Sequence, residues 1–316
     1  MADTMKALAL TGFDEQPAVI DVPIPEPGPG EVLVRVKAAS VNAYDTFVAM
    51  GAARAYMAYE FPAVLGGDVA GTVEAVGEGI DAFSAGDRVF GMMGTKGAIH
   101  DGSFGELATP QAAALARTPD TVADEQAGAL GVAGTTAMSA VNAVEPAEGS
   151  QVLIVGATGG VGTIAIQLAA ARGAHVIASV RPGDDDVVRG LGATDTVDYT
   201  GDLAKTVRER YPDGVDALLD LVDRDPQTFA ALVGLVRKGG RATSVVGAAG
   251  EASEIDGVAV SNTGGDPAHL DALGALVAAG TVRIHIQRTY PLAAAAKALA
   301  DFTNEHTVGK RIIVSS

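Results

Sequence analysis

The segment QVLIVGATGGVG, from Gln151 to Gly162, carries the most specific local pattern of this chain. An apolar run leads into the spacing G-x-x-G-x-x-G, and Ile164, Leu168 and Ala171 then fall on one face of a helix, so strand, glycine turn and helix are predicted in succession. Glycines let a ligand approach the backbone, and a helix N-terminus offers N–H groups and a partial positive charge. The pattern therefore predicts a turn that binds a dinucleotide pyrophosphate, with a purely structural turn as the alternative. The predicted binding residues are Gly156, Thr158, Gly159, Gly160, Val161 and Gly162.

Two of these glycines are expected to have different tasks. Gly159 is expected to lie closest to the pyrophosphate, where a β-carbon would intrude on the ligand and any positive φ angle would add to the cost of a side chain. Gly162 is expected to let the helix pack close to the strand.

The end of the next predicted strand bears on which dinucleotide binds. An NAD site often has an acidic residue there, whereas this chain has Ser179 and Arg181, and a hydroxyl with a guanidinium suits a ribose 2′-phosphate. NADPH is therefore the predicted cofactor. The acidic run Asp184–Asp186 would repel a phosphate that it faced, but acids are also favourable where a helix begins. Tyr199, after the following strand, either lies against the adenosine end or is an amphipathic edge residue.

The organisation of the chain changes near residue 122. Short strands with glycine turns, at 5–12, 31–39, 69–76 and 87–92, indicate a β-rich first domain. Helical segments then alternate with apolar strands, which is typical of a doubly wound α/β domain with a parallel sheet. The last residues, with a strand in RIHIQRTYPL, a helix and a strand in GKRIIVSS, are expected to return to the first domain. We therefore place one domain at 1–122 and 280–316 and the other at 123–279.

Composition excludes several classes of function. A net charge of −17 disfavours binding to nucleic acid or to anionic membranes. The chain has no Cys, which excludes disulfides, thiolate catalysis and Cys-ligated zinc, and its five histidines are scattered without ligand spacing. No signal peptide or membrane span is recognisable, so a cytoplasmic location is expected.

These segments form a longer pattern that resembles the medium-chain dehydrogenase/reductases. ASVNAYDTFVAMG, FPAVLGGDVAGTVEAVG and FSAGDRVFG resemble the N-terminal domain of that family. GVAGTTA and VGATGGVG resemble its cofactor domain, and HTVGKRIIV is similar to its ending. The most similar subgroup is the zinc-free quinone oxidoreductases, also called zeta-crystallin-like. The resemblance implies a GroES-like catalytic domain, a Rossmann domain, an active-site cleft between them, and a homodimer or tetramer assembled through the cofactor domain.

Departures from the zinc alcohol dehydrogenases shape the expected chemistry. Asn42 stands where those enzymes carry a ligand Cys, and Gly66, Gly67 and Asp68 stand where they carry Gly-His-Glu. Without a Lewis acid to polarise an alcohol or ketone, the expected reaction is hydride transfer from NADPH to a quinone or an α,β-unsaturated carbonyl. Three alternatives stay open: an enal or enone reductase without quinone activity, a non-catalytic NADPH-binding protein, and an enoyl reductase acting on acyl thioesters, which the acidic balance disfavours.

Candidate catalytic residues lie in the first domain. Asn42 is expected either to be a polar group of the cleft that also contacts the cofactor, or only to cap the turn after its strand. Tyr44, Tyr56 and Tyr59 are expected to line the pocket or donate to a carbonyl, with ordinary core or rim positions as the alternative. The resemblance further implies cofactor contacts from Thr135, Thr136, Leu221, Val222, Val246, Gly247 and Lys310, although Lys310 could also be a solvent-facing lysine.

Overall fold

The computed structural model describes residues 3–94 and 97–315, which form two compact units. The first unit comprises Met1–Val132, Pro267–Ala278 and Ile286–Ser316, and the second comprises Ala133–Asp266 and Ala279–His285. The first unit thus extends beyond the predicted boundary at 122, and it also takes 267–278 from the range predicted for the cofactor domain. The reason is packing: α2 (Asp124–Ala127) contacts strands β3 and β6 of the first unit, and α8 (Leu270–Ala278) contacts its strand β10.

The second unit is a doubly wound α/β domain, as predicted. Its sheet has the order β13-β12-β11-β14-β15-β17-β16, and every neighbouring pair is parallel except β16 and β17. The strands are β11 (Gln151–Val155), β12 (His175–Val180), β13 (Asp195–Asp198), β14 (Val215–Asp220), β15 (Val236–Ser244), β16 (Glu254–Ile255) and β17 (Val258–Asn262). The helices are α3 (Val132–Val144), which begins at the end of the first unit, α4 (Gly160–Ala170), α5 (Asp185–Gly190), α6 (Leu203–Arg210) and α7 (Pro226–Val233).

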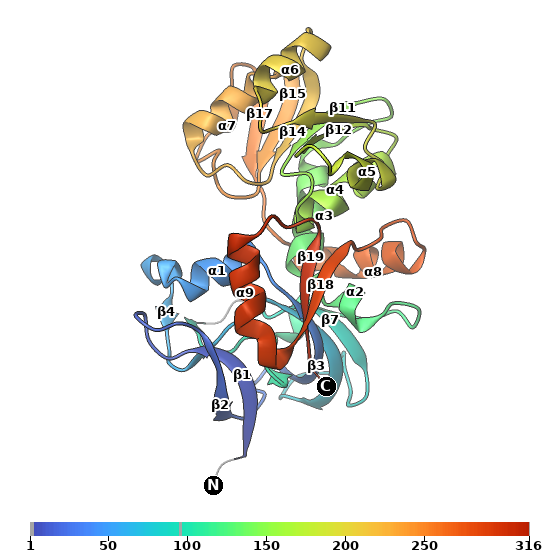
Figure 1. Ribbon diagram of the computed structural model, residues 1–316. Coiled ribbons are helices and arrows are strands. Elements are labelled where there is room, and N and C mark those ends of the chain that lie inside the picture. Colours follow the sequence, from blue (N-terminus) through green and yellow to red (C-terminus); the bar gives the residue numbers. More distant parts are fainter. Residues whose placement is uncertain (1–2, 95–96, 316) are drawn as a thin grey trace. The chain divides into compact units, whose positions relative to one another are not determined.

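Helices cover both faces of this sheet (Figure 1). Leu153 of β11 and Phe229 of α7 are fully buried in one core cluster, which also holds residues of α6. Helix α4 packs against β11 and β12 and is buried along almost its whole length, from Gly162 to Ala169. Helix α4 therefore buries more of its surface than the single apolar face that was expected. Ala171, which was expected on that face, is exposed just after the helix.

The first unit is rich in β-structure, as its short strands and glycine turns predict, and its strand pairs are antiparallel except β18 with β19 and β4 with β8. The main sheet has the order β10-β7-β6-β3-β19-β18, with β9 also paired to β3, and a smaller sheet has the order β2-β1-β5. The remaining strands, β4 and β8, pair with each other. The strands are β1 (Thr4–Leu10), β2 (Ala18–Pro23), β3 (Val32–Ser40), β4 (Ala58–Tyr59), β5 (Ala63–Val64), β6 (Asp68–Val76), β7 (Arg88–Met92), β8 (Ala98–Ile99), β9 (Leu107–Ala108), β10 (Leu115–Arg117), β18 (Ile286–Pro291) and β19 (Lys310–Val314).

Alternation along β3 explains why that strand is central. Val32, Val34 and Val36 are buried, whereas Leu33 and Arg35 between them are only partly covered, which is the period-2 pattern of a strand with one face on the core. The segment 310–314 pairs with β3 as β19, and β18 pairs with β19. Residues 286–316 therefore return to the first unit, as predicted, whereas 280–285, which were also assigned to the first domain, belong to the second unit.

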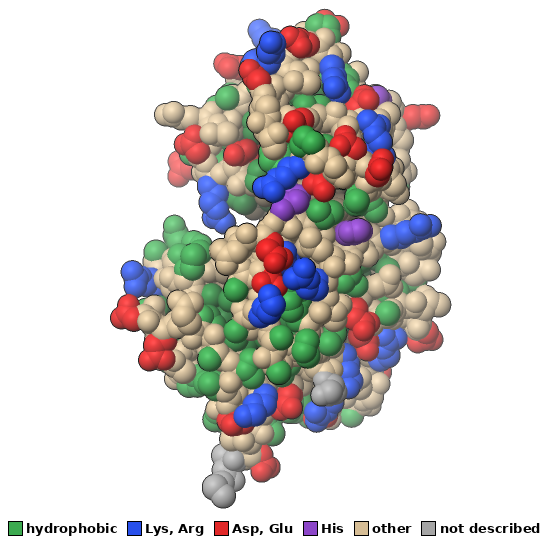
Figure 2. Space-filling view, in the orientation of Figure 1, with side chains coloured by type: hydrophobic (Ala, Val, Ile, Leu, Met, Phe, Trp, Pro, Cys, Tyr) green, Lys and Arg blue, Asp and Glu red, His purple; other side chains and the backbone are tan. Residues whose placement is uncertain are grey.

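Helices of the first unit are short apart from two. In its described residues they are the α-helices α1 (Ala43–Ala49), α2, α8 and α9 (Ala295–Asn304) and the 3₁₀ turns η1 (Ala52–Ala55), η2 (Ala112–Ala114), η3 (Pro267–His269) and η4 (Leu292–Ala294). Helix α9 buries Ala295, Ala298 and Leu299, and its polar side carries Asp301, which pairs with Lys297. Figure 2 shows acidic and basic side chains next to one another on the visible face of this unit. Among the described residues, no helix has the length and apolar character needed to cross a bilayer.

Candidate cofactor site and buried polar cluster

The three glycines of the turn between β11 and α4 differ in what surrounds them. A β-carbon on Gly162 would lie 2.3 Å from the carbonyl oxygen of Gly156 and 2.5 Å from that of Ala157, so only glycine fits where α4 packs onto the turn. A β-carbon on Gly159 would meet, among the described residues, only the Gly156 carbonyl oxygen at 3.5 Å. Gly159 therefore borders open space at the N-terminus of α4.

A positive φ angle occurs at Gly156 rather than at Gly159. Gly156 has a φ of 83°, and a β-carbon there would lie 2.7 Å from Cγ1 of Val222. Gly159 has a φ of −72°, which any residue adopts. A side chain at Gly159 thus carries no penalty from φ, and any cost of such a side chain arises from the space that it fills.

Two neighbouring strands hold the turn in place. The hydroxyl of Ser179, at the end of β12, accepts a hydrogen bond from the Gly156 N–H at 3.0 Å. Val222, which follows β14, packs beside Gly156, and Leu221 lies next to it. The structure thus brings Gly156, Ser179, Leu221 and Val222 together. Ser179 is 1% exposed, so its hydroxyl supports the turn from inside the domain.

Asp220, the last residue of β14, is a buried group that the sequence analysis did not single out. Its Oδ1 accepts hydrogen bonds from the N–H groups of Val222 and Asp223, both at 3.1 Å, which shapes the loop beside Gly156. Burial raises the pKa of Asp220 to about 6, and its Oδ2 has no hydrogen-bond partner among the described residues. The available signal was the position of this acid at the carboxyl end of the apolar run VDALLDL, where a continuous apolar run indicates a strand buried on both faces.

Arg181 and Tyr199 lie together beyond the carboxyl ends of β12 and β13. Arg181 Nε donates to the Tyr199 hydroxyl at 2.6 Å, and its guanidinium lies 5.9 Å from the centre of that ring. The acidic run belongs to a helix start: Asp185 begins α5 and accepts a hydrogen bond from Thr196 at 2.6 Å, which lowers the pKa of its carboxyl. The structural interpretation of this run therefore has direct support for Asp185.

The remaining predicted cofactor residues of the second unit are placed as follows. Thr135 and Thr136 are buried in α3. Val246 and Gly247 follow β15, where the Ser244 hydroxyl accepts from the Val246 N–H at 3.2 Å and Gly247 has a φ of 87°. Their contact with a cofactor stays a prediction.

A buried polar cluster surrounds Asn42 in the first unit. The Asn42 amide nitrogen donates to Ser40 O at 3.1 Å and to Asp68 Oδ2 at 2.9 Å, and its Oδ1 accepts from Lys310 Nζ at 2.6 Å. Asp68 also accepts from the Ser40 hydroxyl and from the Val132 N–H. The amide is therefore oriented by three partners, and both of its N–H groups are used inside the cluster. The alternative of a solvent-facing Lys310 is wrong, because this side chain is 3% exposed, and its contact with a cofactor stays a prediction.

Burial sets the electrostatics of this cluster. Lys310 Nζ lies 3.9 Å from Asp68 Oδ2, and both side chains are almost fully buried. Burial lowers the pKa of Lys310, while Asp68 and Asp45 oppose that change. Asp45, which accepts from the Asn42 N–H at 2.7 Å, has its pKa raised to about 7 by burial and by Asp68. The cluster thus holds one ammonium group among two carboxyl groups in the interior.

The three candidate tyrosines are spread over the surface around α1. Tyr59 donates its hydroxyl to Val48 O at 2.9 Å, and Tyr44, 46% exposed, lies 3.5 Å from the Met57 sulfur. Tyr56 is 82% exposed. The structure therefore does not gather these phenols at Asn42, and their contact with a substrate stays a prediction. Among residues 3–94 and 97–315, no group of three or more metal-binding side chains is arranged to hold an ion.

Comparisons with known proteins agree with both units. Residues 28–120 match the alcohol dehydrogenase GroES-like domain, and residues 191–313 match a family described as zinc-binding dehydrogenase. A quinone oxidoreductase of Pseudomonas aeruginosa is 31% identical over 95% of this chain and 94% of its own length. The chloroplastic quinone-oxidoreductase QR1 of Triphysaria versicolor is 34% identical over 57% of this chain, and the match spans only 56% of that protein.

A solved structure is similar throughout. The quinone oxidoreductase from Coxiella burnetii superimposes with a TM-score of 0.87 at 26% identity, covering 99% of each chain. Sequence and structure thus match from the first unit to the last strand. The chain belongs to the medium-chain dehydrogenase/reductase superfamily, whose members are nicotinamide-dependent oxidoreductases, and quinone oxidoreductases are among its relatives.

Proposed function

We propose that this protein is a zinc-independent, NADPH-dependent reductase that transfers hydride to a quinone or to an α,β-unsaturated carbonyl compound. The observation that carries the proposal is the glycine turn before α4. Gly159 borders open space at the helix N-terminus, where backbone N–H groups favour an anionic pyrophosphate. Ser179 binds the Gly156 N–H and Asp220 binds the loop beside Gly156, so two neighbouring strands support the proposed binding surface.

Arg181 supports the preference for NADPH. Its Nε donates to the Tyr199 hydroxyl, which orients the guanidinium, and no described residue is hydrogen-bonded to its two terminal nitrogens, which suit a phosphate. Asp185 of the nearby acidic run accepts a hydrogen bond from Thr196. A 2′-phosphate at this position would therefore meet a fixed cation.

Replacing Arg181 by alanine is expected to remove most of the preference for NADPH over NADH. A charge-assisted contact to phosphate contributes about 1.5–3 kcal/mol, which is about tenfold or more in affinity. The chain has no Trp, so the increase in fluorescence of bound NADPH gives both dissociation constants directly.

Arg208→Ala is the matched control, since Arg208 is an exposed arginine of α6 in the same unit. It is expected to leave both dissociation constants unchanged. Equal affinity of the wild-type protein for NADH and NADPH would show that the acidic run faces the nucleotide, and the choice of cofactor would then be wrong.

Zinc independence is supported by the residues that stand where the related zinc enzymes carry their metal ligands. Asn42 and Asp68 bind Lys310 there, and a buried ammonium group repels a divalent cation. The chain also offers no Cys ligand. The matching family is described as zinc-binding, so the point needs a measurement of its own.

Treatment with EDTA is expected to leave the rate of NADPH oxidation unchanged, and metal analysis is expected to find less than one zinc per ten chains, roughly the level of an adventitious ion given the lack of ligands. A stoichiometric zinc whose removal abolishes activity would overturn this part of the proposal.

The proposed reaction needs no polarising metal, because quinones and conjugated carbonyl compounds are already electrophilic. When bound, the nicotinamide supplies the hydride. An enone accepts the hydride at its β-carbon, and the resulting enolate takes a proton at the α-carbon; a quinone accepts one hydride and one proton to become a hydroquinone. In this proposal the glycine turn and Arg181 hold the nucleotide in position. The cluster around Asn42 keeps the ammonium group of Lys310 buried in the first unit. The test is acceptor-dependent oxidation of NADPH.

A further inference from the structure

A cavity of about 150 Å³ lies in the first unit and contains none of the residues discussed so far as cofactor or catalytic candidates. Its apolar walls come from β1, β2, β5 and β9, whose residues Met5, Val22, Val64 and Leu107 belong to a small core cluster of their own. The rest of the lining is proline-rich and includes Pro23, Pro25 and Pro62. The pocket is partly open to solvent.

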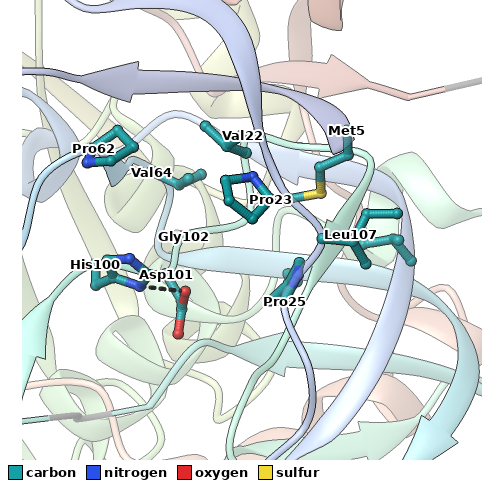
Figure 3. A pocket seen from close by; sticks show the side chains of 12 residues that line it. Met5, Val22, Pro23, Pro25, Pro62, Val64, His100, Asp101, Gly102 and Leu107 are labelled. Atoms are coloured by element: carbon teal, nitrogen blue, oxygen red, sulfur yellow. Dashed lines mark hydrogen bonds and ion pairs between the residues drawn. The ribbon is translucent and has the colours of Figure 1, made fainter. Parts of the chain in front are cut away.

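One polar pair interrupts the apolar lining. In Figure 3, His100 and Asp101 lie on one side of the pocket, and Met5 and Leu107 lie on the other. His100 Nδ1 is 2.7 Å from Asp101 Oδ1. The His100 side chain is 48% exposed, so this side of the cavity is in contact with solvent. The cavity is therefore an apolar pocket with a polar, accessible side.

Backbone hydrogen bonds fix the position of the polar pair. The Val64 N–H donates to His100 O at 2.7 Å, and the Glu60 N–H donates to Ile99 O at 3.1 Å. Gly102 lies so close to the backbone of Leu65, the residue after β5, that a β-carbon on Gly102 would be 2.3 Å from Leu65 O. The backbone at His100 is thus fixed beside the pocket, and Asp101 holds the imidazole through its Nδ1.

The contact with Asp101 decides what His100 can recognise. A carboxylate only accepts hydrogen bonds, so the Nδ1 of His100 carries the proton. In the neutral imidazole, Nε2 is then a hydrogen-bond acceptor. A ligand at this wall must offer an O–H or N–H group, and the nearby carboxylate disfavours an anion.

Volume and chemistry together point to one class of ligand. An apolar cavity of about 150 Å³ is large enough for a benzene ring. A ring of this size with a single hydroxyl group satisfies both the apolar walls and the acceptor on His100. We propose that this pocket is a binding site for a neutral monocyclic phenol, separate from the nucleotide site and independent of the proposed hydride transfer.

The test compares phenol with toluene, which has a methyl group in place of the hydroxyl. Methyl resonances of Val22, Val64 and Leu107 report occupancy in NMR titrations of the whole protein without cofactor. Both ligands are expected to shift these resonances. In His100→Leu, the ratio of phenol affinity to toluene affinity is expected to fall about fivefold to tenfold, the effect of one lost hydrogen bond. Comparing ratios removes the change in hydrophobicity that the substitution itself introduces.

His269→Leu is the matched control, because His269 lies in the same unit but does not line the pocket; its ratio is expected to equal that of the wild type. Val22→Phe is expected to fill the cavity and abolish binding of both ligands, with a melting curve showing whether the variant is folded. The wild-type titration and His100→Leu decide the matter even if it is not. The proposal would be overturned if phenol at about 20 mM, a concentration at which even weak binding is detected, left these methyl resonances unshifted. It would also be overturned if the ratio of phenol affinity to toluene affinity in His100→Leu equalled that of the wild type.

Discussion

Gly159→Val is expected to lower the affinity for NADPH by about 100-fold, or about 2.8 kcal/mol, while the protein keeps its stability. Apart from its chain neighbours, the β-carbon of the added side chain meets only the Gly156 carbonyl oxygen within 4 Å among the described residues, and Gly159 has an ordinary negative φ, so the fold is expected to be kept. The valine methyl groups instead fill the space at the start of α4 that the pyrophosphate would occupy. Thermal melting with and without NADPH measures both properties, because a ligand that binds only the native state raises the melting temperature.

Two further glycine variants separate binding from folding. Gly162→Val is expected to destabilise the protein by about 3 kcal/mol, lowering the melting temperature by about 6–12 °C, because its β-carbon would overlap two carbonyl oxygens. Gly190→Val is the matched control, since Gly190 is exposed at the end of α5 and has no atom within 4 Å of its β-carbon position. It is expected to leave the NADPH-induced shift intact. If Gly159→Val also keeps the full shift, the turn is only structural.

Lys310→Met is expected to cost about 3–5 kcal/mol of stability, the usual effect of removing one partner from a buried ion pair. The ammonium group lies 2.6 Å from Asn42 Oδ1 and 3.9 Å from Asp68 Oδ2, and the side chains of Lys310 and Asp68 are almost fully buried. Methionine has a similar length but no charge and no donor, so Asp68 would remain buried without its counter-charge. Urea unfolding of the variant and the wild type gives the difference in free energy.

Lys297→Met is the matched lysine control. Lys297 is largely exposed and pairs with Asp301 one helical turn away, an arrangement that contributes less than about 1 kcal/mol. Asp45→Asn tests the other side of the cluster: with a pKa of about 7, Asp45 is partly protonated at neutral pH, and the isosteric amide still accepts from the Asn42 N–H, so a cost below about 1 kcal/mol is expected. Equal effects of Lys310→Met and Lys297→Met would contradict the account of the buried cluster.

The sequence was sufficient for the fold because the signals that define it are local. The alternation of Val32, Val34 and Val36 and the apolar run before Gly156 each specify a strand and its buried face. The boundaries between the two units were harder to predict from the sequence. Helices α2 and α8 belong to the first unit because of the strands they pack against, and a helix carries no local mark of its distant partner.

The residues of the candidate site differ in the same way: some follow from a local sequence pattern, and others depend on partners far away in the sequence. Gly162 follows from the spacing of the glycines and the predicted helix, and its crowded surroundings agree with that prediction. The environment of Lys310 does not follow, because its partners Asn42 and Asp68 lie more than 240 positions away in the sequence and meet it only through the pairing of β19 with β3. Asp220 was missed for a related reason: its role depends on the loop that its carboxyl group holds beside Gly156.

The measurement that tests the central claim most directly is acceptor-dependent oxidation of NADPH by the metal-depleted protein. The purified protein is treated with EDTA, separated from it, and mixed with NADPH and a panel of quinones, enals, enones and enoyl thioesters, while the absorbance of the reduced nicotinamide is followed. Loss of absorbance that requires both the protein and a quinone, enal or enone is the predicted result. Tight binding of NADPH with no oxidation by any acceptor would contradict the account and identify a cofactor-binding protein without turnover.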